Sequence, residues 1–181
     1  NGKEQEKMGV SLLHVEDMAG LMTPAAAYDL IKALKAELHV PIHLHCHCTG
    51  GMAEMAYWEA IRAGVDGLDV CVSSMSMGPA HPPIESFVAA LKGTSRDSHI
   101  DVAQFKAIND GFLALRKKYP QFETKLIGVD VGCLEHQIPG GMLSNLESQL
   151  TAMKLYDRLP EVLEEVTRVR ADMGYPPLAT P

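Results

Sequence analysis

Three short segments of the chain carry the apolar pattern of strands, and an amphipathic helical pattern follows each of them. The predicted strands are residues 11–17, 40–47 and 65–73. The predicted helices are residues 23–39, 51–64 and 82–93. A strand–helix unit repeated three times predicts a parallel sheet or barrel whose connections are right-handed.

The ends of the first two helices carry local signals. Thr23 followed by Pro24 is a typical N-cap and first helical position. Gly64 is typical of a helix C-terminus, where a left-handed residue closes the last turn. The pattern therefore predicts where these helices begin and end.

The pattern changes after residue 100. Residues 105–115 and 162–169 carry apolar side chains at helical spacing, and residues 129–150 form a turn-rich stretch that leads into a further helix. We therefore divide the chain into three strand–helix units, residues 1–99, and a helical extension of the same domain, residues 100–181. Both ends have the look of cuts in a longer polypeptide.

Composition narrows the classes of function. A net charge of −7 and a pI near 5.6 argue against nucleic acid as a partner. No apolar run approaches the roughly 20 residues of a membrane span, and the polar start has no signal-peptide core. Four cysteines in 181 residues do not form a disulfide framework, which favours a cytoplasmic protein.

The segment IHLHCHCTGG, residues 42–51, is the strongest chemical signal in the chain. Side chains two apart on a strand share a face, so His43, His45 and His47 are expected on one side. His45 and His47 fall at the carboxyl end of the strand, where parallel α/β folds place their active sites. Two imidazoles at this spacing can bind one metal ion.

Two other interpretations of this segment stay open. Hydrogen-bonded histidines also occur as polar layers inside barrels, and His43, one layer deeper, is expected to be structural. Cys46 and Cys48 alternate to the opposite face from the histidines. We expect these cysteines to be small buried hydrophobes rather than zinc thiolates.

Five stretches resemble one known family. They are EDMAGLMTPAAAYDLIKALK, HLHCHCTGG, SSMSMGPAHPPIES, ALKGT and QIPGGMLSNLESQL. In this order and spacing they are similar to the carboxyltransferase domain of biotin-dependent enzymes: the oxaloacetate decarboxylase α subunit, the transcarboxylase 5S subunit and pyruvate carboxylase. The resemblance implies the last three units of a TIM (β/α)₈ barrel and part of the helical extension that follows it.

The resemblance also implies a divalent metal site, with zinc, manganese or cobalt. The family holds the ion through an aspartate, a carbamylated lysine and an H-x-H pair. The pair corresponds to His45 and His47, the lysine position is Glu16, and the aspartate would precede residue 1. Glu16 keeps the negative charge of a carbamate, but its side chain is roughly 3–4 Å shorter. It is the expected third protein ligand.

A second departure concerns the proton. The threonine or serine that shuttles a proton between biotin and pyruvate in the family corresponds to Val131. Valine can neither donate nor accept a proton, so this role has no side chain here and the catalytic residue is unassigned.

The implied reaction moves a carboxyl group between carboxybiotin and pyruvate or oxaloacetate. Biotin would arrive on a separate carrier domain or subunit, because the chain has no biotin-attachment segment. Three strands alone would leave an apolar edge exposed, so we expect a longer chain or a homo- or hetero-oligomer. The alternatives are a non-catalytic homologue kept for subunit assembly and a related metal-dependent lyase or aldolase.

Overall fold

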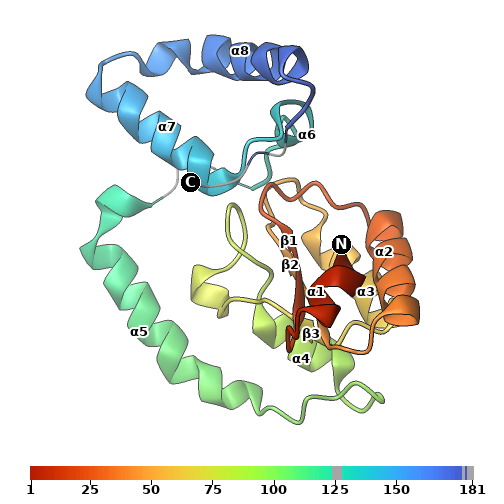
Figure 1. Ribbon diagram of the computed structural model, residues 1–181. Helices are drawn as coiled ribbons and strands as arrows, with labels where there is room; N and C mark the ends of the chain where they lie inside the picture. The colour runs from red at the N-terminus through yellow and green to blue at the C-terminus, as the bar shows by residue number, and fades with distance from the viewer. Residues whose placement is uncertain (124–127, 177, 179–181) are drawn as a thin grey trace.

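The three predicted strand–helix units are present in a computed structural model of the chain, which describes residues 1–123, 128–176 and 178. A parallel sheet contains β1 (Leu13–Asp17), β2 (Ile42–Cys46) and β3 (Gly67–Leu68) in the order β1-β2-β3. The register places Glu16 opposite His45. Figure 1 shows the sheet with helices of the same units packed beside it.

Helices α2 (Pro24–Glu37), α3 (Ala53–Ala63) and α4 (Ile84–Leu91) follow the strands, and α1 (Gly2–Lys7) precedes them. Thr23 is the N-cap of α2, and its hydroxyl accepts a hydrogen bond from the backbone N–H of Ala26 at 3.2 Å. Gly64 ends α3 with φ of 101°, a left-handed conformation that glycine adopts without strain. Both helix-end predictions are confirmed.

β3 is shorter than the strand predicted over residues 65–73. Asp69 still donates its backbone N–H to the carbonyl of Leu44, but Cys71 forms a parallel bridge with Pro83 instead of with β2. An apolar pattern shows which side chains are buried but not which strand the backbone pairs with. It therefore predicted one continuous strand where the backbone pairs first with β2 and then with Pro83.

The alternation along β2 separates a core face from a polar face. Leu44, Cys46 and Cys48 are fully buried against α2 and α3, as expected for small apolar side chains. The Tyr57 hydroxyl accepts from the backbone N–H of Cys46 at 2.8 Å and donates to the carbonyl of Asp69 at 2.7 Å. This buried tyrosine ties α3 to the carboxyl ends of β2 and β3.

The helical extension contains α5 (Phe105–Lys118), α6 (Cys133–His136), α7 (Gly140–Ala152) and α8 (Leu159–Asp172). Single 3₁₀ turns occur at η1 (Ser73–Met75), η2 (Val102–Gln104), η3 (Pro120–Phe122) and η4 (Tyr156–Arg158). In Figure 1, α5 runs along one side of the strand–helix units, and α6, α7 and α8 lie beyond one end of the sheet. Among the described residues, no helix has the length and apolar character needed to cross a membrane.

Candidate metal centre

The candidate centre lies where β2 ends, on the face opposite the apolar core. His45 is within β2 and His47 follows it directly, so both side chains leave the sheet on the same side. Gly20, at φ of +71°, packs against the His47 backbone, where a Cβ would lie 2.5 Å from the His47 carbonyl oxygen. Only glycine fits this close approach, which fixes the loop after β1 against the loop after β2.

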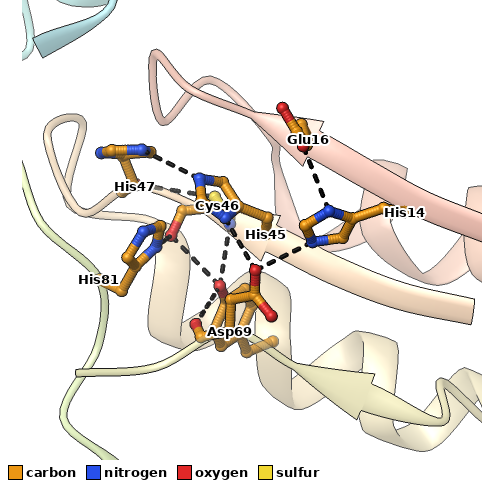
Figure 2. Close-up of polar contacts among 8 residues, drawn as sticks. His14, Glu16, His45, Cys46, His47, Asp69 and His81 are labelled. Carbon is orange, nitrogen blue, oxygen red and sulfur yellow. Dashed lines mark hydrogen bonds and ion pairs between the residues drawn. The ribbon is translucent and has the colours of Figure 1, made fainter. Parts of the chain in front are cut away.

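A third histidine completes a compact group of rings. The Nε2 atoms of His45 and His47 lie 3.1 Å apart. The His81 ring centroid lies 4.1 Å from that of His45 and 4.4 Å from that of His47. One ring nitrogen from each of the three lies within 4.8 Å of the other two, and Figure 2 shows the rings grouped at the end of β2. We call His45, His47 and His81 the three-histidine cluster.

Each ring of this cluster is held by its Nδ1 atom. The partner in every case is an oxygen: the Asp69 carboxylate for His45 at 2.9 Å, the Pro79 carbonyl for His47 at 2.5 Å and the Cys46 carbonyl for His81 at 3.0 Å. A carbonyl or carboxylate oxygen can only accept, so each Nδ1 donates its proton. This arrangement fixes the orientation of all three rings.

Glu16 lies outside the three-histidine cluster. Its Oε1 is 3.2 Å from Nδ1 of His14, and Figure 2 shows it beside His14 and apart from His47 and His81. A second group that could hold an ion consists of His14, His45 and Asp69, and it also does not include Glu16. The structure therefore brings His45 and His47 together, while Glu16 faces His14.

Burial favours the neutral form of two of the rings. It lowers the pKa of His47, against the opposing effect of the hydrogen bond to the Pro79 carbonyl. It also lowers the pKa of His81, against the hydrogen bond to the Cys46 carbonyl. A neutral imidazole is the form that binds a metal ion.

Asp69 is the charged member of the network. Burial would raise the pKa of its carboxyl, but hydrogen bonds and charge interactions with His45 and His14 outweigh burial and lower it. The carboxylate therefore stays ionised and accepts from both histidines through Oδ2, each at 2.9 Å.

Asp17, which follows Glu16, has a structural position. Its Oδ2 accepts from the backbone N–H of Met22 at 2.6 Å and from the Cys46 thiol at 3.3 Å. Burial, followed by the charge of Asp17, raises the pKa of the Cys46 thiol. Cys46 is thus held as a neutral thiol, which is a poor metal ligand.

The loop that carries Val131 lies against the loop after β2. Asp130 donates its backbone N–H to the carbonyl of Thr49 at 2.8 Å, and Val129 packs on Gly51. Val131 itself is 64% exposed. The position that the family resemblance assigns to the proton shuttle therefore belongs to a segment that covers the carboxyl end of β2.

Sequence reasoning did not identify His81 and Asp69. His81 lies in a proline-rich turn without periodicity, and Asp69 lies in a strand that was predicted for its apolar residues. The position of Asp69 near the carboxyl end of β3, beside His45, was the signal that could have found it.

Two family models match the chain. The HMGL-like model covers residues 2–111, and the conserved carboxylase domain model covers residues 133–181. The two matched segments do not overlap, and the first extends into α5.

Curated relatives and solved structures agree with these models. A pyruvate carboxylase subunit of Methanocaldococcus jannaschii is 47% identical over 99% of this chain and 32% of its own length. The methylmalonyl-CoA carboxyltransferase 5S subunit of Propionibacterium freudenreichii subsp. shermanii is 47% identical over 96% of this chain and 35% of its own. The chain thus spans about a third of the length of these relatives.

The carboxyl transferase domain of Rhizobium etli pyruvate carboxylase, solved with pyruvate and biocytin, superposes with a TM-score of 0.94 at 36% identity. The match covers 99% of this chain and 30% of that one. The predicted fold, TIM-barrel strand–helix units followed by a helical extension, is confirmed. The chain therefore belongs to the HMGL-like family and, within it, to the carboxyltransferase domains of the pyruvate carboxylase and transcarboxylase type.

Proposed function

We propose that the protein containing this chain transfers a carboxyl group between carboxybiotin and pyruvate or oxaloacetate at a divalent metal ion. The observation that carries the proposal is the pair of converging imidazoles, His45 and His47, at the carboxyl end of a strand in a carboxyltransferase fold. The biotin carrier is proposed to be a separate domain or subunit, since the relatives include enzyme subunits.

The donor set fits a divalent ion such as zinc, manganese or cobalt. Both rings use Nδ1 to donate to fixed oxygens, which leaves Nε2 of each as the ligand atom. When bound, such an ion supplies Lewis-acid stabilisation for the negative charge that develops on the keto oxygen of pyruvate. His45 and His47 would hold it, and Asp69 and Pro79 would orient the two rings.

Glu16 is the third protein ligand in this proposal. It lies opposite His45 in the parallel register, so the two side chains come from neighbouring strands on one face. Its carboxylate contacts Nδ1 of His14 at 3.2 Å and would have to turn from His14 to reach an ion beside His45. Its 51% exposed side chain leaves room for that rotation.

The overall reaction also requires a proton to move. The pyruvate methyl carbon loses a proton and forms a bond to the carboxyl carbon, while the N–C bond of carboxybiotin breaks and its nitrogen takes up a proton. Val131 cannot carry that proton between the two. We therefore propose that proton transfer is the weakened step of this enzyme.

Two other functions compete with carboxyl transfer. Loss of a proton-carrying side chain at Val131 favours a non-catalytic homologue retained for subunit assembly. A metal-dependent lyase or aldolase would need the ion and the two histidines, but neither biotin nor a proton-shuttling side chain at position 131.

The test is oxaloacetate formation by the full-length protein, loaded in turn with zinc, manganese or cobalt and supplied with its biotin carrier, carboxybiotin and pyruvate. Metal content is measured in the same preparations and in Glu16→Lys. Oxaloacetate that requires both metal and carboxybiotin supports the proposal. Bound metal without biotin-dependent transfer would favour the lyase, and no metal unless Glu16→Lys is introduced would favour the assembly function.

A further inference from the structure

The position of His81 is set by a segment that runs beside the end of β2. Cys48 donates its backbone N–H to the carbonyl of Ala80 at 2.8 Å, and His81 Nδ1 donates to the carbonyl of Cys46 at 3.0 Å. His47 in turn donates from Nδ1 to the carbonyl of Pro79. These contacts hold the His47 and His81 side chains next to each other, because each ring donates to a backbone carbonyl of the other segment.

The hydrogen bonds determine which nitrogen each ring can offer. All three Nδ1 atoms in the three-histidine cluster face oxygens that only accept, so in the neutral rings all three Nε2 atoms carry a lone pair and no proton. A carbonyl or carboxylate on one ring nitrogen with a lone pair on the other is the arrangement seen in metal-bound histidines.

The Nε2 atoms of His45 and His47 lie 3.1 Å apart, within hydrogen-bond distance. Two bare lone pairs at this distance would repel each other, so the pair holds either a shared proton or a shared metal ion. Two nitrogens bound tetrahedrally to zinc at 2.0–2.1 Å are about 3.3 Å apart, so the observed separation is close to that of a shared ion. His81 lies against both rings and closes the third side of the cluster.

The second group, His14 with His45 and Asp69, does not offer an equivalent site. Its distances are those of hydrogen bonds, because Asp69 Oδ2 accepts from both His14 and His45 at 2.9 Å. An ion there would have to displace two imidazole protons. Asp69 therefore orients His45 from behind, and the free nitrogen of His45 faces the three-histidine cluster.

We infer that His81 is a direct ligand of the divalent ion and forms, with His45 and His47, a group of three imidazole ligands. This inference rests on the proposed metal site and adds a ligand to it.

The experiment uses cobalt, whose visible absorption reports its ligands. The full-length protein is stripped with a chelator, titrated with Co²⁺ and compared with His81→Gln and with the control His39→Gln. Glutamine keeps an N–H that can donate to the Cys46 carbonyl, so His81→Gln removes the imidazole while preserving the contact. We expect His81→Gln to weaken Co²⁺ binding at least about 10–100-fold and to change the visible bands. His39→Gln removes an imidazole that is 96% exposed and outside the three-histidine cluster, so it is expected to leave both unchanged.

A second variant tests the same point by gain of signal. His81→Cys places a thiolate where we infer a ligand, and a thiolate bound to Co²⁺ adds a charge-transfer band in the near ultraviolet. The matched control is Cys71→Ser combined with His81→Cys, which removes a nearby half-buried thiol. A band that persists in the double variant assigns position 81 to the ion.

Several outcomes would overturn the inference. They are cobalt binding and spectra that do not change in His81→Gln, the absence of a thiolate band in folded His81→Cys, or an equal loss of cobalt in His39→Gln. The proposed function is judged separately, by carboxybiotin-dependent formation of oxaloacetate in the wild-type protein. A wild-type protein that binds no metal would reject both, whereas a bound ion at His81 without carboxyl transfer would reject only the function.

Discussion

At the scale of single residues, the candidate centre consists of rings whose orientation is set from behind. Asp69 holds His45, and backbone carbonyls hold His47 and His81. Such partners fix which ring nitrogen is free and reduce the ordering that a ligand would otherwise require on binding. Of these three partners, the Asp69 carboxylate also carries a negative charge.

Asp69→Asn should therefore weaken metal binding without removing a ligand. Asparagine can still accept one hydrogen bond, but the negative charge that makes His45 a better donor is lost. We expect a fall of about 10–100-fold in Co²⁺ or Zn²⁺ affinity, measured by competition with a chromogenic chelator. Asp29→Asn, which changes an exposed carboxylate on α2, is the control. Equal affinities for Asp69→Asn and wild type would show that His45 needs no such support.

Val131→Thr tests the proposal that position 131 lacks a proton-carrying side chain. A threonine hydroxyl can accept and donate a proton where valine cannot, and such positioned groups contribute about 10²–10⁴-fold. We expect faster carboxyl transfer and faster exchange of pyruvate methyl protons with solvent deuterium, followed by NMR. Val131→Ala controls for the change in size at this 64% exposed position. Threonine and alanine variants of equal rate would refute a proton-carrying role for this position.

The sequence predicted one part of the centre and missed another for a physical reason. His45 and His47 were found because a strand has a two-residue period, and that period alone places them on one face. His81 belongs to a turn whose path depends on hydrogen bonds to the end of β2, such as that of Cys48 with Ala80. No periodicity encodes contacts of that kind.

At the scale of elements, the start of β2 is held by the carboxylate of Asp66, the residue directly before β3. Asp66 accepts from the Lys35 ammonium of α2 at 2.8 and 3.0 Å and from the backbone N–H of Ile42 at 2.8 Å. One side chain thus connects the end of a helix, the start of a strand and the loop before the next strand.

This contact predicts a pH dependence of stability. Burial would raise the pKa of Asp66, but the hydrogen bonds from Lys35 and Ile42 outweigh it and hold the pKa below its ordinary value of 3.8. A carboxyl with a lowered folded-state pKa stabilises the protein above the unfolded value, and this contribution is lost as the pH falls through the folded value.

Asp66→Asn should accordingly be less stable than wild type at neutral pH, with a difference that shrinks below about pH 4. Urea unfolding midpoints of both proteins between about pH 2 and 6 give this difference directly. Asp29→Asn, an exposed carboxylate on α2, is the matched control and should follow wild type. A constant difference across the acid range would mean that the charge of Asp66 contributes nothing.

The elements themselves were largely predictable from the sequence, and their partners were not. Thr23 and Gly64 mark helix ends through chemistry that acts within a few residues. The end of β3 depends on the bridge between Cys71 and Pro83, which no local pattern specifies. Local rules thus gave the boundaries of the helices and failed where a strand changes its neighbour.

At the scale of the whole molecule, α5 is held to the strand–helix units by polar contacts. Asn109 accepts from the backbone N–H of Ser74 at 2.8 Å and donates to the carboxylate of Glu85 at 2.5 Å. Arg116 donates to the Ser74 carbonyl at 2.6 Å. No side chain of α5 is fully buried, and Ile108 and Leu115 are about half exposed. The junction of the extension therefore depends on a few hydrogen bonds around η1.

Asn109→Ala should loosen this junction without unfolding the strand–helix units. The substitution leaves the Ser74 N–H and the Glu85 carboxylate without this partner, at a cost of about 1–3 kcal/mol for an unsatisfied half-buried group. Because no α5 side chain is fully buried, that loss falls on the helix itself and not on the core formed by α2 and α3. Hydrogen–deuterium exchange of the full-length protein measures the loss of stability separately for each helix.

We expect faster exchange of α5 amides in Asn109→Ala and unchanged exchange in α2 and α3. Lys106→Ala is the matched control on the same helix, since it removes an exposed ion pair with Asp110 and no contact to η1. If both variants exchange like wild type, the apolar side chains of α5 must be held by another surface of the full protein, and the polar junction at η1 would be dispensable. If both accelerate α5 equally, helix propensity rather than docking controls its stability.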